Sequence, residues 1–279
     1  PESQAGRLCQ KRRGFALNRN IIFCVFSLAT ILSCSFRQTE FPAKTQGDEP
    51  GSKSAHRERQ ILPPPLAAKG KTFFPSILHP NDQTVMVLIN AGAKSRSSEV
   101  QPFYIDQHEI TVKKFTALNP KYSEKPYTGN RICPNCPAMG IDWFKANEYC
   151  RWAGKRLPTE AEWEFAAQGP AGNLWPWGNQ LLPGHANLAG DEDGHSLASP
   201  VGSFPQGSSP YGVLDMIGNV WEWVSDSVGE AKDPKKVQRI LKGGSWLTSP
   251  QNISPSFRSI TDPALKNPAF GFRCSKSLT

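Results

Sequence analysis

Residues 169–212 are the feature that most constrains the fold of this 279-residue chain, because they show no regular pattern of apolar side chains. Neither a helical period nor a strand alternation runs through them. A loop of that length inside a compact domain usually needs something besides a hydrophobic core to order it. We therefore expect a domain in which loops carry much of the structure.

Oxygen-bearing side chains gather near the end of this loop, in the run DEDGH at residues 191–195. Clustered acidic oxygens between glycine turns suit Ca²⁺, which takes about six to eight oxygen ligands. His185 and His195 flank the acids, but their spacing matches no zinc or iron site. A solvated acidic loop is the alternative interpretation.

A second candidate site follows at residues 213–223, with the sequence VLDMIGNVWEW. Its composition matches neither a buried helix nor an alternating strand. Asp215 and Glu222 bracket a Gly-Asn turn, and Trp221 and Trp223 flank the second acid. Such a segment suits a loop whose acids and carbonyls surround a hard cation. A Trp-rich core turn with solvated acids is the alternative.

The formal net charge of +8 lies almost entirely in the N-terminal part of the chain. Residues 1–80 hold 12 Lys or Arg and 5 Asp or Glu, a net of +7, which leaves +1 for residues 81–279. A surface that binds nucleic acid would need its positive charge on the folded domain. We therefore expect no nucleic-acid partner.

The first 34 residues have the pattern of an export signal. Basic residues precede an apolar run at residues 21–32, which is typical of a secretory signal peptide and is short for a membrane span. The run ends at Ser33-Cys34, and residues 31–34 resemble a bacterial lipobox, in which the cysteine is lipidated. We expect residues 1–34 to be a signal peptide with a lipid anchor on Cys34. An ordinary or uncleaved signal, or a short buried helix, is the alternative.

Residues 35–80 are rich in Pro, Lys, Ser, Gln and Gly, with three consecutive prolines at 63–65. Few apolar side chains are available there to offset the entropy lost on ordering, so the segment is expected to be a disordered tether. Such a tether would hold the domain off a membrane of the bacterial cell envelope, on its periplasmic or surface side. The folded domain is expected to comprise residues 81–279.

Signals of regular structure become dense from Val85 onward. Apolar runs predict strands at residues 85–89, 103–106 and 270–274, and residues 240–246 are interpreted as a strand that enters a tight glycine turn. Helical spacing predicts helices at residues 112–118 and 143–152, and a third between Thr159 and Gly169. Thr159 and Glu162 have the spacing of a capping box. The acids of this third helix are therefore interpreted as cap and dipole partners rather than as acid–base catalysts.

Several motifs, taken together and in this order, resemble the formylglycine-generating enzyme (sulfatase-modifying factor) family. They lie at residues 103–106 with 109–111, 154–164, 177–179, 218–223, 243–246 and 271–273. The resemblance extends over residues 82–276, and the blocks at 154–164 and 218–223 are its most specific parts. It implies an α+β fold: a single domain related to the C-type lectin fold and poor in regular secondary structure.

The resemblance also implies two structural Ca²⁺ sites built from oxygen donors. One would use the side chains of Asn187 and Asp193 and the carbonyls of Leu188 and His195. The other would use the side chains of Asp215 and Glu222 and the carbonyls of Gly218 and Val220. Both sets fall on loop positions, which agrees with the interpretation of the two acidic segments above.

The chain has seven cysteines, and an even set in the domain of an exported protein suggests disulfides. The family pairs the cysteine of the 143–152 helix with the one after the GFR motif. The resemblance thus implies a Cys150–Cys274 bridge, worth about 4–5 kcal/mol by chain entropy, and leaves Cys133 to pair with Cys136. A CxxC pair can be redox-active, but a proline follows each of these two cysteines, which favours a local structural bridge.

The chain departs from the family's enzymes after the GGSW motif at residues 243–246. Enzymes that convert a sulfatase cysteine to formylglycine carry two cysteines there, which bind copper and activate oxygen. The corresponding positions hold Thr248 and Ile253, and neither supplies a thiolate for Cu(I). We therefore expect no copper and no formylglycine-generating activity.

Two functional hypotheses of different classes follow. The first is an exported, membrane-anchored protein whose calcium-ordered domain binds a protein, a peptide or a glycan without catalysis. The second is a periplasmic enzyme, of the oxidoreductase type found in the family, that modifies an exported peptide or small molecule. Its candidate residues are Ser245, Thr248, Arg258 and Arg273. The two arginines suit a bidentate contact with a carboxylate, or else each is a partner in a structural ion pair.

Overall fold

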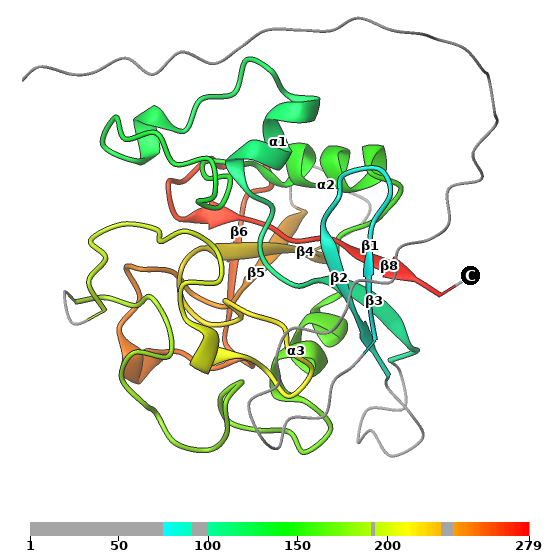
Figure 1. Ribbon diagram of the computed structural model, residues 1–279, viewed down its shortest axis with the longest axis vertical. Coiled ribbons are helices and arrows are strands. Elements are labelled where there is room, and N and C mark those ends of the chain that lie inside the picture. The colour runs from blue at the N-terminus through cyan, green and yellow to red at the C-terminus, as the bar shows by residue number, and fades with distance from the viewer. Residues whose placement is uncertain (1–74, 91–99, 191–192, 230–236, 279) are drawn as a thin grey trace, which may run out of the picture. The chain divides into compact units, whose positions relative to one another are not determined.

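The computed structural model describes residues 75–90, 100–190, 193–229 and 237–278 (Figure 1). The expected signal peptide, Cys34 and nearly all of the expected tether lie outside these residues, so their roles stay predictions. Within the described part of the chain, no helix has both the length and the apolar character needed to cross a membrane.

Two four-stranded sheets form the framework of the described domain (Figure 1). The first has the order β1-β2-β3-β8 and contains β1 (Ser76–Leu78), β2 (Val85–Ile89), β3 (Phe103–Asp106) and β8 (Ser275–Ser277). The second has the order β6-β5-β4-β7 and contains β4 (Trp221–Val228), β5 (Gln238–Lys242), β6 (Arg258–Thr261) and β7 (Phe270–Gly271). All neighbouring strands are antiparallel except β4 and β7, which are parallel.

Regular structure begins earlier than the composition of the expected tether indicated. The tether was expected to reach residue 80, but β1 lies inside it and pairs with β2, with Ser76 opposite Val87 and Leu78 opposite Val85. An edge strand of three residues is ordered by backbone pairing with its neighbour. It therefore needs few apolar side chains, and a compositional argument overlooks it.

The strand expected at residues 270–274 is in fact two strands in different sheets. Phe270 and Gly271 form β7 beside β4, whereas β8 starts at Ser275 and pairs with β3. The intervening residues, Phe272 to Cys274, cross from one sheet to the other, and all of them are buried. The pattern of residues 270–274 does not reveal this crossing, because β7 and the crossing residues are buried alike.

The sequence patterns predict neither β4 nor β6. Strand β4 begins at Trp221, within the segment that we interpreted as a loop, and Glu222, Trp223 and Val224 are all buried. A strand that is buried on both faces shows no alternation of polar and apolar residues. Strand β6 has no apolar run that would indicate a strand, since the residues from Arg258 onward are mostly polar and only half-buried or exposed.

The three predicted helices are confirmed as α1 (Val112–Leu118), α2 (Trp143–Trp152) and α3 (Glu160–Gln168). The predicted capping box of α3 is also present: Thr159 Oγ1 accepts from the Glu162 N–H, and the Glu162 carboxylate accepts from the Thr159 N–H at 2.9 Å. Both oxygens of Glu162 further accept from Arg156 at 2.6 Å. The acids at the start of α3 therefore act in capping and ion pairing.

Two large groups of buried side chains fill the space between the helices and the sheets. One packs Trp163 of α3 against residues of the first sheet such as Ile105. The other brings together the rings of Phe115, Tyr149 and Phe272, whose centroids are 5.5–6.0 Å apart. These contacts hold α1, α2 and the crossing segment in one core.

Both expected disulfides are confirmed. Cys150 and Cys274 are bonded across a sequence separation of 124, and Cys133 and Cys136 are bonded across a separation of 3. The first bond ties α2 to the crossing segment. The second closes a local turn, in agreement with the interpretation of the CxxC pair as a structural bridge.

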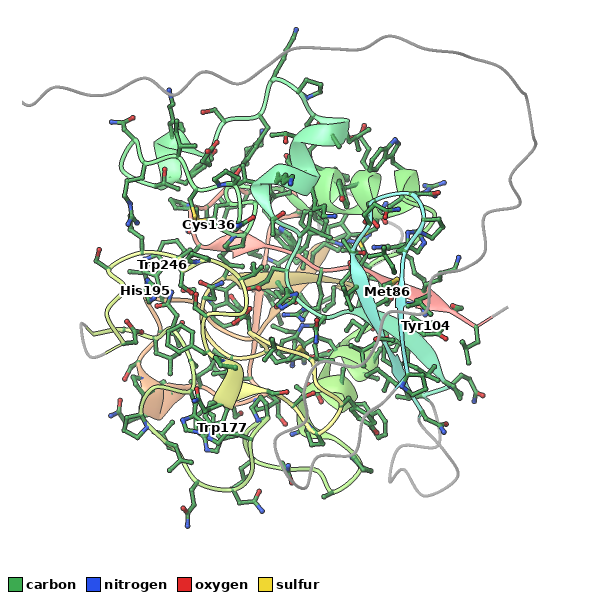
Figure 2. The ribbon with its side chains drawn as sticks, viewed as in Figure 1. Met86, Tyr104, Cys136, Trp177, His195 and Trp246 are labelled. Carbon is green, nitrogen blue, oxygen red and sulfur yellow. A yellow bond between two sulfur atoms is a disulfide. The ribbon has the colours of Figure 1, made fainter. Side chains whose placement is uncertain are left out.

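Residues 169–212 contain one short 3₁₀ turn, η2 (Pro205–Gly207), in their described part and otherwise no helix or strand. The loops of this stretch occupy one side of the view in Figure 1, away from the first sheet. Figure 2 shows Trp177 and His195 among these loops, and Met86 and Tyr104 in the first sheet. The expectation of a loop-dominated region is confirmed, and the candidate site residues lie in and beside it.

Candidate functional site

The glycine turn after β5 brings together Thr248 and Ile253, the two positions at which the resemblance implies copper-binding cysteines in the family's enzymes. Gly243 and Gly244 have φ angles of 90° and 77°, a region that favours glycine. A Cβ placed on Gly244 would lie 2.6 Å from Ile253 Cδ1 and 3.3 Å from Thr248 Oγ1. Thr248 and Ile253 thus pack against the same glycine. The place where the resemblance implies two thiols in the family's enzymes holds one hydroxyl and one hydrocarbon group.

The polar groups of this turn are used within it. Thr248 Oγ1 accepts from the Ser245 N–H at 3.0 Å, and Ser245 Oγ accepts from the Leu247 N–H at 3.3 Å. Ile253 is buried with Leu188 and Ile217. The hydroxyls of Ser245 and Thr248 therefore stabilise the turn, and among the described residues neither one has a hydrogen bond to a histidine or acid that would act as its base.

Arg273, one of the catalytic candidates, is fully buried and forms a structural ion pair. Its Nε and Nη2 each donate to one oxygen of Glu222 at 2.7 Å. Its remaining N–H groups donate to the carbonyls of Asp106, Gln107 and Leu214. Burial alone would lower the pKa of Arg273, but the charge of Glu222 and its hydrogen bonds hold that pKa above its usual value. Every nitrogen of the guanidinium therefore already donates a hydrogen bond within the protein.

Arg258, the other candidate arginine, lies half-exposed at the start of β6. Its Nη1 is 3.1 Å from Glu160 Oε2. Lys242, which is buried, also pairs with Glu160 and lies 2.6 Å from Glu164. These ion pairs join α3 to the second sheet. The structure therefore places Ser245 and Thr248 in one turn, while both arginines serve ion pairs elsewhere.

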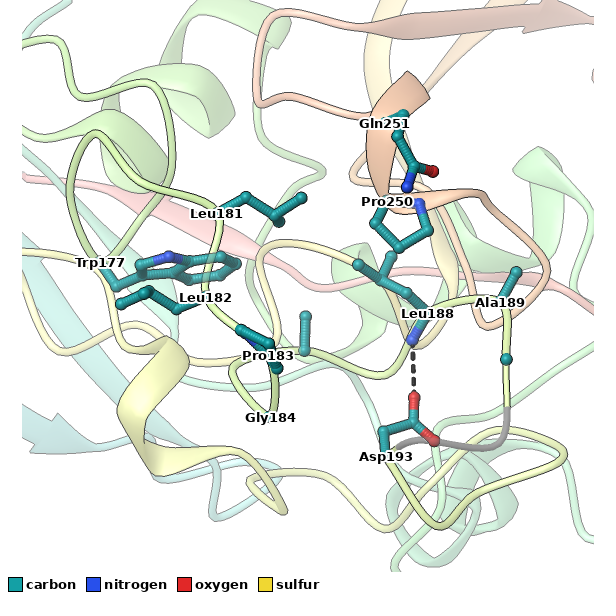
Figure 3. Close-up of a pocket in the computed structure, with 12 residues that line it drawn as sticks. Trp177, Leu181, Leu182, Pro183, Gly184, Leu188, Ala189, Asp193, Pro250 and Gln251 are labelled. Carbon is teal, nitrogen blue, oxygen red and sulfur yellow. Dashed lines mark hydrogen bonds between the residues drawn. The ribbon is translucent and has the colours of Figure 1, made fainter.

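A cavity of about 240 Å³ opens beside the glycine turn (Figure 3). Its walls come from loop residues between 177 and 190, from Asp193 and from the 3₁₀ turn η4 (Pro250–Asn252), which lies between Thr248 and Ile253 in the sequence. The lining is mostly apolar and includes Trp177, Leu181, Leu182, Pro183, Leu188 and Pro250. In Figure 3, the first four lie on one side, and Leu188 and Pro250 lie on the other.

The aromatic wall of this cavity is held in place by its neighbours. Trp177 stacks on Trp175 with ring centroids 5.5 Å apart, and its Nε1 donates to the Gln180 carbonyl at 2.8 Å. Leu181 and Leu182 remain 42% and 40% exposed. No sequence pattern that we interpreted predicted this cavity. The available signal was a set of large apolar residues in a stretch with no helix or strand to bury them.

The residues of the first expected calcium site do come together. Asn187 is 1% exposed, its Nδ2 donates to the Leu197 carbonyl at 3.0 Å, and its Oδ1 is buried without a hydrogen bond from the described residues. Asp193 accepts from the Leu188 and His195 N–H groups, both at 2.9 Å. A buried acceptor without a donor costs about 1–3 kcal/mol, and a cation is one group that would satisfy it.

The residues of the second expected site are all at the Gly-Asn turn, but the Glu222 carboxylate already accepts hydrogen bonds from other side chains. Besides Arg273, its carboxylate accepts from Trp163 Nε1 at 2.9 Å. Asp215 is 6% exposed with a φ of 56°, and one of its oxygens accepts from the Gly202 N–H at 2.6 Å. Burial raises the pKa of Asp215, and the hydrogen bond from Gly202 opposes this effect.

A side chain that the sequence analysis did not single out lies next to Asp215. Glu109 is 2% exposed, and its carboxyl group interacts electrostatically with that of Asp215. Burial raises the pKa of Glu109 well above its usual range, and the charge of Asp215 adds to this effect. Glu109 belongs to one of the motifs that carry the resemblance, which was the only signal available for it.

Asn219 connects the two expected sites through its side chain. Its Oδ1 accepts from Asn187 Nδ2 at 3.1 Å and from the Ser199 N–H at 2.9 Å. Its Nδ2 donates to Glu109 Oε1 at 3.0 Å. Asn219 is fully buried and has a φ of 55°, a conformation that asparagine tolerates better than most residues. One buried network therefore runs from Asn187 to Glu109.

The donors in both sets suit a hard cation rather than a soft one. No group of three or more His, Cys, Asp or Glu side chains that could hold a metal occurs in the described ranges. A metal there would have to draw on carbonyl and amide oxygens together with one or two acids. That donor chemistry is typical of Ca²⁺, so the first set fits the ion and the second fits it except at Glu222.

Comparisons with known proteins agree with the motifs. A family model described as "Sulfatase-modifying factor enzyme 1-like domain" matches residues 81–278. The inactive Cα-formylglycine-generating enzyme 2 of Bos taurus is 38% identical over 164 residues, which cover 54% of this chain and 53% of that protein. The formylglycine-generating enzyme of Streptomyces coelicolor is 37% identical over 195 residues, which cover 60% of each. The chain thus spans little more than half the length of these curated relatives.

Solved structures share the fold at lower sequence identity. PvdO from Pseudomonas aeruginosa is 23% identical with a TM-score of 0.59, covering 75% of this chain and 100% of that one. Treponema denticola variable protein 1 is 20% identical with a TM-score of 0.61, covering 73% and 98%. These two structures support the expected α+β, C-type-lectin-like architecture.

Proposed function

The chain belongs to the sulfatase-modifying factor family, and from this premise we propose that its domain binds a peptide segment without generating formylglycine. The observation that carries the proposal is the pair Thr248 and Ile253. These residues occupy the positions of the copper-binding cysteines and pack against the same glycine, Gly244. By the resemblance, the turn lacks the two thiols that the reaction needs.

The cavity beside this turn favours a peptide over a glycan as the ligand. Its volume of about 240 Å³ is below the roughly 300–1,000 Å³ of pockets for whole small molecules, so it suits one large side chain. Asp193 and Gln251 are the polar or charged side chains among its lining residues. A sugar ring would leave several hydroxyls unpaired there, which is costly. An apolar peptide side chain would gain about 1.5–3 kcal/mol from full burial.

Two calcium ions are proposed to order the loops that form this site. Asn187 and Asp193 would hold the first ion and Asp215 the second, with the carbonyls of Leu188, His195, Gly218 and Val220 as further ligands. A bound Ca²⁺ would supply fixed positive charge to buried oxygens. Asp193 and Leu188 also line the cavity, so calcium would stabilise one of its walls.

Export and anchoring are a further part of the proposal, supported by the sequence pattern of residues 1–34. We expect Cys34 to be lipidated in a bacterial envelope, on the periplasmic or surface side. Radioactive palmitate should label the full chain, and Cys34→Ala should remove the label. Retention of the label in that variant would contradict the anchor.

The binding proposal is tested with a peptide array probed by the purified full chain. We expect capture of peptides with an exposed aromatic or large aliphatic residue, and Trp177→Ala should weaken capture about tenfold because it removes the aromatic wall. Trp152→Ala is the matched control, since that indole is 43% exposed on α2 and does not line the cavity. Equal loss in both variants would contradict the proposed site.

The expected absence of formylglycine-generating activity is tested on the same chain. It is incubated with a cysteine-containing sulfatase-type peptide, Cu(I) and oxygen, and the products are examined by mass spectrometry. We expect the peptide to be unchanged. Formation of an aldehyde would overturn the proposal in favour of catalysis.

A further inference from the structure

A second cavity, of about 730 Å³, lies between the end of α1, the 3₁₀ turn η1 (Lys125–Tyr127) and the start of α2. In Figure 1, α1 and α2 lie next to one another at the top of the view. The cavity shares no lining residue with the one beside the glycine turn. Its volume is within the roughly 300–1,000 Å³ of pockets that hold a whole small molecule.

Two tyrosine rings form fixed walls of this second cavity. Tyr122 Oη donates to the Met139 carbonyl and accepts from the Met139 N–H, both at 2.9 Å. The ring of Tyr122 also meets that of Phe115 edge-on, with centroids 5.0 Å apart. The ring of Tyr127 covers Gly140, because a Cβ on that glycine would clash with it. Both rings are therefore held in place before a ligand binds, which lowers the entropy cost of binding.

The charged groups that line the cavity are mostly cationic. They are the ammonium groups of Lys121, Lys145 and Lys266 and the carboxylate of Asp142, a net of +2 (3 minus 1). Asp142 caps α2 and lies 3.6 Å from Lys266, and Lys145 pairs with Glu148 at 2.6 Å. Even with Glu148 included, the net charge is +1 (3 minus 2). Lys121 is exposed and forms no ion pair with the described residues, so the cavity has positive charge to offer a ligand.

Asn119 adds a buried donor that has no acceptor. It follows the last residue of α1 and lines the cavity. Its backbone is fixed, because its N–H donates to the Phe115 carbonyl at 3.1 Å and its carbonyl accepts from the Tyr122 N–H at 2.9 Å. Its side-chain Nδ2 is buried and has no hydrogen bond to any described residue. An unpaired buried donor is costly, and an oxygen of a bound ligand would remove that cost.

We propose that this cavity between α1 and α2 binds a small aromatic carboxylate. The rings of Tyr122 and Tyr127 suit contact with a flat aromatic body. A carboxylate only accepts hydrogen bonds, so it matches a lining in which Asn119 and the lysines are donors. A cationic ligand would instead be repelled by the lysines. This binding is additional to the peptide binding proposed for the cavity at Trp177.

The test compares two probes of similar shape and different charge, naphthalene-2-carboxylate and naphthalene-2-carboxamide. Calorimetric titration of the full chain at neutral pH measures both affinities. We expect the carboxylate to bind at least about tenfold more tightly, because hydrogen bonds to a charged group are stronger than those to a neutral one. Equal affinities, or no binding of either probe, would overturn the proposal.

Two variants place the probe in this cavity. Lys121→Gln with Lys266→Gln removes two exposed charges and should weaken carboxylate binding about fivefold without changing carboxamide binding. Asn119→Asp keeps the shape of the side chain but replaces the buried donor with an acid. It should weaken the carboxylate more strongly and spare the carboxamide, whose NH₂ group can donate to the new acid. In lysine variants that melt like wild type, equal weakening of both probes would contradict the proposed contacts.

Lys113→Gln is the matched control, because that lysine is exposed on α1 and does not line the cavity. It should leave both affinities unchanged, and so should Trp177→Ala in the other cavity. A loss of carboxylate binding in Trp177→Ala alone would place the probe beside the glycine turn and overturn the proposal. Because the two cavities share no lining residue, failure of peptide capture and failure of carboxylate binding are distinguishable.

Discussion

The glycine turn after β5 and the loops around Asn219 are neighbours, yet they differ in how well their residues match those that the family resemblance implies. The Gly218 N–H donates to the Gly243 carbonyl at 2.8 Å, and the Trp246 N–H donates to the Asn219 carbonyl at 3.1 Å. The loops retain oxygen donors at the expected calcium positions. The turn has Thr248 and Ile253 at the positions where the resemblance implies two thiols.

This difference indicates that the fold and the family's reaction depend on separate sets of residues. Buried polar networks and the Cys150–Cys274 bond hold the domain together, and none of them passes through the side chains of Thr248 or Ile253. The side chains at the turn are then free to change without loss of the fold. Removing parts of the framework should accordingly cost more stability than rebuilding the turn.

The largest expected effect is the loss of the long-range disulfide. Replacing Cys150 and Cys274 with alanine should lower the free energy of unfolding by about 4–5 kcal/mol, because the bond closes a long loop. The same change at Cys133 and Cys136 should cost about 2 kcal/mol or less, since that loop is short. Urea denaturation of both variants measures the two values. Equal losses would contradict the view that the first bond carries the framework.

Breaking the buried ion pair should have the next largest effect. Arg273→Met leaves Glu222 charged and unpaired in the core, which should cost about 3–5 kcal/mol. The double variant Arg273→Met, Glu222→Met removes both charges and should recover a large part of that loss. Chemical denaturation of the single and double variants decides this. A double variant less stable than the single one would show that losing the hydrogen bond from Trp163 Nε1 to Glu222 costs more than the unpaired charge.

Removal of calcium should have a smaller effect on the same framework. At a free concentration of about 100 times the dissociation constant, one ion stabilises the native state by about 2.7 kcal/mol, so EGTA should lower Tm by roughly 5–10 °C. Differential scanning calorimetry with and without EGTA measures the shift, and added Ca²⁺ should reverse it. A Tm that does not respond to EGTA would contradict the prediction that calcium stabilises the framework.

Introducing two cysteines at the turn should lower the stability least, and it should add metal binding that the wild type is expected to lack. Thr248→Cys with Ile253→Cys shortens one buried side chain, for which we expect a loss of about 1–2 kcal/mol. Because both side chains pack on Gly244, the two thiols should bind one Cu(I) per chain. Competition with a Cu(I) chelator measures this, with wild type and the single Thr248→Cys variant as controls. Equal binding by the single and double variants would contradict the shared position of the two residues.

Local signals in the sequence were sufficient for much of the secondary structure and for the fold class. The capping box of Thr159 and Glu162 depends on residues three positions apart, so the start of α3 could be predicted without knowing its surroundings. The motif order identified the domain and, with it, the pairing of Cys150 and Cys274. The replacement of the two thiols at Thr248 and Ile253 was also readable from the sequence.

The tertiary structure alone decided which distant residues meet. The split of the last strand into β7 and β8, the pairing of Arg273 with Glu222, and the hydrogen bond from Asn219 to Glu109 each depend on segments that are far apart in the chain. The cavity likewise combines Trp177 with Pro250. Hydrophobic periodicity and capping patterns report on neighbours within a few turns of chain. Contacts between distant segments are set by packing, and for that reason the sequence indicated the framework but not the partners within it.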